Sequence, residues 1–237
     1  MKVVATIYTD FSEKFGIPRQ GALAHESEGI IVFEPEYRME EALRGIEKYS
    51  HLSFYDLYDF DAFINTGEYK WSPTVRPPRL GGNKRVGVFA TRSPFRPNPI
   101  GLTAVRLIGV EQTKNKGAVL RVAGVDLMNG TPIYDIKPYL PYADSIPEAS
   151  LGFAGEHLMD VLEVVCSDEL WGKIPEDKRG ALEEVLSQDP RPAYHEDETR
   201  KYGMEFSGFD IIFHVKKKVL YVDEIKKGNL TTKSKLL

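Results

Sequence analysis

The stretch Ala-Thr-Arg-Ser-Pro-Phe-Arg-Pro-Asn-Pro-Ile-Gly, from Ala90 to Gly101, is the most distinctive part of this chain. Its three prolines fix φ and push the residues before them out of helical conformations, so we predict an irregular, stiff loop. Such a loop loses little conformational entropy on binding and holds Arg92 and Arg96, whose guanidinium groups suit carboxylate or phosphate recognition. The stretch therefore predicts a ligand-binding loop, with a rigid structural corner as the alternative.

Short predicted strands surround this loop on both sides. They are rich in β-branched and aromatic residues and are separated by Gly, Pro and Asn. Such short strands indicate a closed barrel or a sandwich. One helix, from about Pro35 to Lys48, is expected to plug or flank the barrel. The predicted strands are Val3–Tyr8, Gly29–Phe33, Leu52–Tyr58, Arg85–Thr91, Leu102–Val110, Ala118–Val125 and Thr131–Ile136.

The pattern changes after residue 144, which we take as the end of a first domain, 1–144. Residues 145–155 are rich in Ser, Pro, Ala and Gly and are typical of a linker. A smaller α+β domain, 156–225, follows, with a flexible basic tail at 226–237. In the second domain we predict two helices and then a two-stranded hairpin, at Glu156–Glu169, Pro175–Ser187, Lys201–His214 and Lys217–Glu224.

The composition excludes several classes of protein. The chain has 237 residues, of which 42% are hydrophobic, and no apolar run approaches the roughly 20 residues of a membrane span. No signal peptide is recognisable, so we expect a cytoplasmic protein. The single Cys166, predicted to be a buried small residue, and five scattered His residues give no metal site. Neither a Rossmann glycine motif nor a P-loop is present.

Local charge differs from the net charge of −4, which argues against indiscriminate coating of nucleic acid. The segment 75–101 contains six basic residues and no acidic one. We predict an anion-binding surface there, with a solvated basic loop as the alternative. The six are Arg76, Arg79, Lys84, Arg85, Arg92 and Arg96.

Two later segments add polar candidates. The Asn129-Gly130 pair predicts a tight turn, and Asp126 just before it is suited to a ligand ammonium or ribose hydroxyl. In the next strand, alternation places Asp135, Lys137 and Tyr139 on one face, where they could form the wall of a site. An exposed ion pair between Asp135 and Lys137 is the alternative.

Taken together, these segments resemble the TsaA-like (TrmO) family of tRNA methyltransferases. Six motifs carry the resemblance, occur in order and extend over most of the chain. They are FGIPRQ at Phe15–Gln20, SPTVRPPRLGGN at Ser72–Asn83, GVFATRSPFRPNPIG at Gly87–Gly101, DLMNGTP at Asp126–Pro132, DIKPYLP at Asp135–Pro141 and DPRPAY at Asp189–Tyr194.

The resemblance implies a fold that is mainly β with α: a small, non-Rossmann β-barrel core and a smaller α+β C-terminal domain. It also implies a homodimer with S-adenosyl-L-methionine bound near the subunit interface. The implied substrate is tRNA, at the threonylcarbamoyl-modified adenosine just 3′ of the anticodon, methylated on its exocyclic nitrogen. No metal and no membrane are implied.

Residue by residue, the resemblance implies a cofactor pocket formed from several loops. Relatives follow the motif at residues 50–52 with an apolar run ending in a polar pair that contacts the cofactor, whereas residues 53–60 here are unusually acidic. Ungapped counting places Asp59 and Phe60 at that contact, and Asn129 stands where an Asp is common. The implied cofactor residues are Pro18, Arg19, Gln20, Asp59, Phe60, Arg92, Gly101, Leu102, Asp126, Leu127, Met128 and Asn129.

For the chemistry we predict that Asp135 or Tyr139 assists removal of the acceptor proton while Lys137 steadies charge. Contacts to tRNA are expected from a basic and aromatic set, although Tyr194 could instead pack at a domain interface. A non-catalytic module that senses S-adenosylmethionine or binds RNA is a rival, as is a methyltransferase of another small substrate. The predicted substrate contacts are Arg76, Arg79, Arg96, Arg191 and Tyr194.

Overall fold

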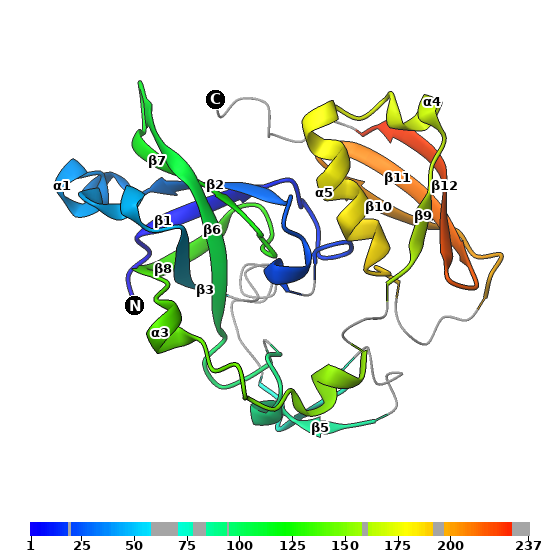
Figure 1. The fold of residues 1–237 in the computed structure, drawn as a ribbon, viewed down its shortest axis with the longest axis horizontal. Coiled ribbons are helices and arrows are strands. Elements are labelled where there is room, and N and C mark those ends of the chain that lie inside the picture. The colour runs from blue at the N-terminus through cyan, green and yellow to red at the C-terminus, as the bar shows by residue number, and fades with distance from the viewer. Residues whose placement is uncertain are drawn as a thin grey trace.

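The computed structural model describes residues 1–18, 20–57, 71–77, 84–93, 95–157, 161–191 and 197–228. Figure 1 shows a β-barrel formed by the first part of the chain beside a helix-backed sheet formed by the last part. The predicted fold class, a barrel core with a smaller α+β unit, is confirmed.

The barrel is closed by six strands, and each neighbouring pair is antiparallel. Successive side chains point to opposite faces of a strand, so alternate apolar residues fill the interior. Ile7, Ile31, Phe54 and Leu120 are wholly buried there. The order is β1 (Ala5–Thr9), β2 (Glu28–Phe33), β7 (Gly117–Ala123), β6 (Ile100–Thr113), β3 (His51–Leu57) and β8 (Thr131–Pro138).

A bulge interrupts the pairing of β3 with β8. Tyr55 pairs with Asp135, but Asp56 pairs with Ile133, so Tyr134 is an extra residue in β8. One extra residue shifts the alternation by one, so residues after the bulge point to the opposite side from the one that the residues before it would predict. Ile133 therefore lies in the barrel core, while Asp135 is half exposed outside it.

The predicted helix at Pro35–Lys48 is wrong as a single element. Three short turns replace it: η2 (Pro35–Tyr37), α1 (Glu40–Leu43) and η3 (Ile46–Lys48). Gly45, with φ +90°, adopts the left-handed conformation that interrupts a helix. The segment flanks the barrel, as one of the two predicted alternatives had it (Figure 1).

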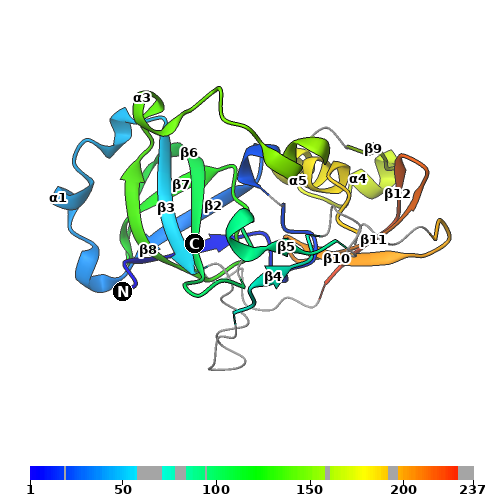
Figure 2. The same cartoon turned by 90° about the horizontal axis from the view of Figure 1, so that it is seen from below.

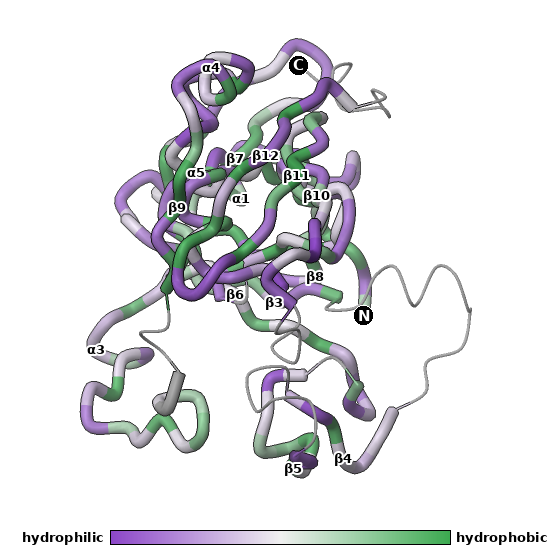
Figure 3. The backbone as a smooth tube through the Cα atoms, turned by 90° about the vertical axis from the view of Figure 1, so that its right-hand side faces the viewer, coloured by the Kyte–Doolittle hydropathy of each residue, from purple (hydrophilic) through white to green (hydrophobic). Residues whose placement is uncertain are grey.

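The predicted strand at Arg85–Thr91 is also wrong. Only β5 (Val86–Gly87) is extended, paired with β4 (Thr74–Val75), and the 3-10 turn η5 (Val88–Ala90) follows. This two-stranded ribbon stands apart from both domains in Figure 3, so it has no barrel strand beside it. Lacking such a neighbour, the apolar run cannot continue as a sheet strand.

The C-terminal sheet has the order β10 (Tyr202–Phe206), β11 (Phe209–Lys216), β12 (Val219–Lys227) and β9 (Glu163–Val165). The predicted strand at Lys201–His214 is divided by a turn at Ser207-Gly208, where both φ values are positive. Because β12 extends to Lys227, Lys226 and Lys227 belong to a strand and not to a flexible tail.

The predicted helix at Glu156–Glu169 is wrong, whereas the one at Pro175–Ser187 is confirmed as α5 (Glu176–Ser187). The first region forms η6 (Gly152–His157), then β9, then α4 (Asp168–Trp171), which Ser167 caps by accepting from Leu170 N at 3.3 Å. β9 pairs in parallel with β12, and this long-range pairing outweighs local helix preference. Cys166 is half-buried there, not buried as expected.

The segment after β1 leaves the barrel and packs into the second domain, as Figures 1 and 2 both show. Phe11 is buried in the C-terminal core, edge-on to Phe206 with ring centroids 5.8 Å apart. Asp10 forms a largely buried ion pair of 2.8 Å with Lys178 of α5. The segment that follows β1 therefore connects the barrel to the C-terminal domain by packing and by an ion pair. The described residues also form the short helices η1 (Gly21–Leu23) and α3 (Pro141–Asp144).

Candidate functional site

A pocket of about 410 Å³ lies against the outer wall of the barrel. Strand register explains its floor, because Ala104, Ser53 and Lys137 are neighbours across β6, β3 and β8. Residues from four other parts of the chain, at 20–22, 92, 126 and 139–144, complete it. The lining consists of Gln20, Gly21, Ala22, Ser53, Tyr55, Arg92, Leu102, Thr103, Ala104, Asp126, Lys137, Pro138, Tyr139 and Asp144.

Arg92 ties together the parts of the chain that border this pocket. Its Nη1 donates to Gln20 Oε1 at 2.7 Å, and its Nη2 donates to the carbonyl of Leu102 at 2.8 Å. The neighbouring Arg96 donates to the carbonyl of Thr91 at 3.1 Å, which closes the proline-rich loop on itself. One arginine therefore borders the pocket while the other holds the loop.

Asp126 provides a carboxylate at the inner end of the pocket. Its Oδ2 accepts from Gly21 N at 3.0 Å, and its Oδ1 accepts from the Thr103 hydroxyl at 3.2 Å. Burial raises the pKa of Asp126, and these hydrogen bonds together with Arg92 oppose that rise. Gly21 lies so close to the backbone of Gly124 that only glycine fits at position 21, because a Cβ atom there would lie 2.0 Å from the carbonyl oxygen of Gly124.

A second carboxylate, Asp56, lies in the barrel interior near Asp126. Its side chain has an exposed fraction of 0%, and neither oxygen has a hydrogen-bond partner among the described residues. Burial, and then the charge of Asp126, raises the pKa of Asp56 to about 7. Sequence reasoning did not single out Asp56, although its inward position follows from the alternation Leu52, Phe54, Asp56.

The three residues proposed for the chemistry are neighbours at the pocket. Lys137 and Tyr139 line it, and Lys137 Nζ forms an ion pair of 2.7 Å with Asp135, both side chains being more than half exposed. The hydrogen bond and charge of Asp135 raise the pKa of Lys137. The pair is thus an exposed ion pair, as the alternative interpretation had it, and its lysine lines the pocket.

Several predicted cofactor residues do not line this pocket. Leu127 is buried in the barrel core, and Asn129 Oδ1 accepts from Thr9 N at 3.0 Å, which fastens the turn to the end of β1. The carbonyl of Met128 accepts from Thr131, and Gly101 lies against the Asp56 carboxylate. Tight-turn sequence signals alone do not distinguish such scaffolding contacts from ligand contacts.

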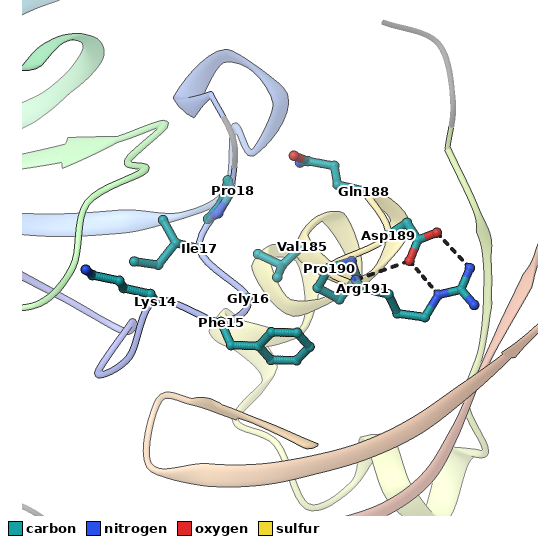
Figure 4. Close-up of a pocket in the computed structure, with 10 residues that line it drawn as sticks. All are labelled: Lys14, Phe15, Gly16, Ile17, Pro18, Val185, Gln188, Asp189, Pro190 and Arg191. Carbon is teal, nitrogen blue, oxygen red and sulfur yellow. Dashed lines mark hydrogen bonds and ion pairs between the residues drawn. The ribbon is translucent and has the colours of Figure 1, made fainter. Parts of the chain in front are cut away.

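A second, smaller pocket of about 190 Å³ lies between the loop at residues 14–18 and the end of α5 (Figure 4). Pro18 and Arg191 line this second pocket and do not line the first one. The side chain of Arg191 is 13% exposed, and its guanidinium is held by Asp189, with Nε 2.8 Å from Oδ1. Arg191 thus binds a carboxylate within its own loop.

The remaining predicted residues fall into two groups. Arg76 is exposed at the end of β4. Arg19, Asp59, Phe60, Arg79 and Tyr194 lie outside the described residues. Within the described ranges there is no cluster of three or more His, Cys, Asp or Glu that could hold a metal ion. No helix in that part of the chain is long and apolar enough to cross a membrane.

Fold and pocket together define this chain as a closed-barrel protein with a candidate site for a small polar ligand. The family model of the tRNA-methyltransferase O N-terminal domain matches residues 6–145, and that of the TrmO C-terminal domain matches residues 163–228. The chain belongs to the tRNA-methyltransferase O family, as the sequence motifs indicated.

Relatives with known names agree with this membership. The chain is 41% identical over 220 residues to the tRNA (adenine(37)-N6)-methyltransferase of Escherichia coli, a match covering 90% of this chain and 91% of that protein. It is 36% identical over 150 residues to a Pyrococcus abyssi protein named as a probable S-adenosyl-L-methionine-binding protein, covering 63% and 73%. The crystal structure of TrmO from Pseudomonas aeruginosa superposes with a TM-score of 0.75 at 32% identity, over 96% of this chain and 97% of that one.

Proposed function

We propose that this protein is an S-adenosyl-L-methionine-dependent tRNA methyltransferase. Its substrate is the threonylcarbamoyl-modified adenosine beside the anticodon, methylated on the exocyclic nitrogen. The observation that carries the proposal is the pocket in which Arg92 and Asp126 meet the outward side chains of β3, β6 and β8. The names of the Escherichia coli and Pyrococcus abyssi relatives support it.

The residues of the pocket fit this cofactor. About 410 Å³ lies within the roughly 300–1,000 Å³ range of small-molecule sites. Asp126 offers a carboxylate to an ammonium group or a ribose hydroxyl, and the orphaned carboxylate of Asp56 behind it adds negative potential. When bound, S-adenosylmethionine supplies a methyl group activated by a positively charged sulfur.

The protein then acts mainly by positioning the two reacting molecules. Methyl transfer requires the acceptor nitrogen to lie in line with the carbon–sulfur bond, and holding reactants in place lowers the barrier substantially. The acceptor nitrogen is weakly nucleophilic, so Asp135 or Tyr139 assists the removal of its proton while Lys137 stabilises the charge that develops. The ion pair of Lys137 with Asp135 keeps that carboxylate at the edge of the pocket.

The proton-transfer roles predict that Asp135→Asn and Tyr139→Phe lower the single-turnover rate. A general base contributes about 10²–10⁴-fold, so the variant lacking the true base should lose at least about 100-fold. Glu224→Gln is a matched control, because Glu224 forms an exposed ion pair of 2.9 Å with Lys226 on the C-terminal sheet. If both site variants transfer methyl at the wild-type rate, neither side chain is the base.

Substrate tRNA is proposed to contact the basic residues around the loop and the end of α5. Arg76 is exposed on the ribbon, and Arg96 holds the proline-rich loop in shape. Arg79, Arg191 and Tyr194 complete the proposed set, with Tyr194 stacking on an unpaired base. We also propose a homodimer, supported by the exposed apolar side chains of Phe95, Ile100 and Leu102 beside the pocket.

The function is tested by mass spectrometry of nucleosides from tRNA treated with the protein and S-adenosylmethionine. We expect one added methyl group on the threonylcarbamoyl-modified adenosine. Protein that takes up the cofactor but leaves tRNA unchanged would instead be a sensing or RNA-binding module. Methyl transfer found only in tRNA-free extract would indicate a different small substrate, and either result overturns the proposal.

A further inference from the structure

The side chain of Asp56 is the least compensated polar group in the described part of the chain. Alternation along β3 directs it into the barrel with Leu52 and Phe54, both wholly buried. Its two carboxylate oxygens have no hydrogen-bond partner among the described residues. Burying an ionised carboxylate without partners is costly, so its charge must be stabilised from outside or removed by a proton.

The neighbours of Asp56 connect it to the pocket. Gly101 faces it across the β3–β6 pair, and a Cβ atom at Gly101 would lie 2.3 Å from Asp56 Oδ1. Thr103 stands next to it, and the hydroxyl of Thr103, which donates to Asp126 at 3.2 Å, also acts to lower the pKa of Asp56. Thr103 and Asp126 both line the pocket, so Asp56 lies directly behind the pocket wall.

The charged groups that act on Asp56 come from three segments. Asp126, after β7, repels its negative charge, while Arg92, in the proline-rich loop, attracts it. Tyr134, at the bulge in β8, is influenced by Asp56 and has its own pKa raised, so its hydroxyl stays neutral near neutral pH. Asp126 and Arg92 border the pocket, which means that a charge placed in the pocket also acts on Asp56.

We propose that Asp56 is a second, buried carboxylate of the cofactor site, which makes the pocket prefer the cationic sulfonium of S-adenosylmethionine to the neutral thioether left after methyl transfer. This inference rests on the proposed function. Both molecules carry the same ammonium, carboxylate and nucleoside groups, so they differ only in the transferred methyl group and in the positive charge that it places on sulfur. In a poorly solvated interior, one unit charge acts on another over several ångströms.

The preference follows from the protonation of Asp56. Because its pKa is raised to about 7, by burial first, Asp56 is about half protonated at neutral pH in the free protein. A cation in the pocket favours the ionised form and expels the proton. Next to a neutral sulfur, the carboxylate takes up a proton again, and the attraction between the carboxylate and the sulfonium is lost. Product is therefore released more readily than reactant.

Calorimetry on the full chain tests this with S-adenosylmethionine and S-adenosylhomocysteine at pH 6 and pH 8. For the wild type, the ratio of the two dissociation constants should favour the sulfonium more strongly at pH 8 than at pH 6. Asp56→Asn should reduce that preference at pH 8 by roughly tenfold and remove its change with pH. Asp144→Asn, at an exposed carboxylate of the same pocket, should alter the ratio much less because solvent screens it.

A second measurement needs no variant. Titrations of the wild type at pH 7 in buffers of different ionisation enthalpy should show protons released on binding the sulfonium, and fewer on binding the thioether. Because these titrations use the wild type alone, they keep the test decisive if Asp56→Asn does not fold. Tight S-adenosylmethionine binding with an unchanged ratio or equal proton release would overturn the role of Asp56 and leave the proposed function standing. Absence of any S-adenosylmethionine binding would overturn both.

Discussion

Gly21→Ala is expected to destabilise the protein by about 2–3 kcal/mol and to weaken S-adenosylmethionine binding at least about tenfold, because overpacking at this position moves the edge of the pocket. A Cβ atom there would lie 2.0 Å from the carbonyl oxygen of Gly124, which is backbone. That backbone is held in turn by the hydrogen bond from Gly124 N to Ser27 O, at 2.9 Å. Relief must come from η1, which would carry Gly21 N away from Asp126.

Urea unfolding and calorimetry measure the two effects of Gly21→Ala. Gly87→Ala is the control, because no atom lies within 4 Å of a Cβ at Gly87 and its φ of −59° suits any residue. We expect the control to stay within about 0.5 kcal/mol of the wild type. A Gly21→Ala protein that unfolds and binds like the wild type would show that the contact of η1 with Gly124 is not needed for the pocket.

Asp56→Asn is expected to stabilise the ligand-free protein, and increasingly so as the pH rises. The folded pKa of Asp56, about 7, lies above its ordinary value of 3.8. Between these values the folded chain keeps a proton that the unfolded chain has lost, so the stability of the wild type falls as pH rises through this window. The advantage of the variant in unfolding free energy should be about 3 kcal/mol larger at pH 8.5 than at pH 5.

This pH dependence is measured by urea unfolding of the wild type and the variant at both pH values. Titrating groups far from position 56 contribute equally to both proteins, so the difference reports on Asp56 together with Asp126, whose charge acts on it. Glu148→Gln is the control, since Glu148 is exposed in the folded chain and does not line the pocket. A difference between wild type and Asp56→Asn that stays constant with pH would mean that position 56 carries no buried, titrating carboxylate.

Prediction from the sequence succeeded where local rules were sufficient. The alternation of β1, β2, β6, β7 and β8 is strong enough that each predicted strand overlaps the observed one. It failed for residues 163–165, which were predicted as helix but pair with β12 from more than fifty residues later. It failed again at 85–91, because an apolar run becomes a sheet strand only when another strand lies beside it.

For the candidate site, too, the sequence predicted some of the residues that line the pocket and also named others that do not. Family resemblance suggested Gln20, Arg92, Leu102 and Asp126, and the structure brings all four to one pocket. Leu127, Met128 and Asn129 belong to the same motif, but their contacts are with β1, with Thr131 and with the barrel core. Motifs preserve ligand contacts and scaffold contacts together, so the sequence does not separate them.

By itself, the sequence determined the strand-rich class, the stiff proline-rich loop with Arg92 and the family, because φ restriction, strand alternation and motif order are local properties. Strand alternation left a barrel or a sandwich open, and the family resemblance indicated the barrel. Only the tertiary structure decided that Asp56 lies behind Asp126 and that Asp135 lies outside the barrel beside Lys137. The side of β8 on which Asp135 lies depends on strand register and on the bulge at Tyr134, which are set by pairing between residues about eighty positions apart. A shift of one residue there would exchange the inner and outer faces.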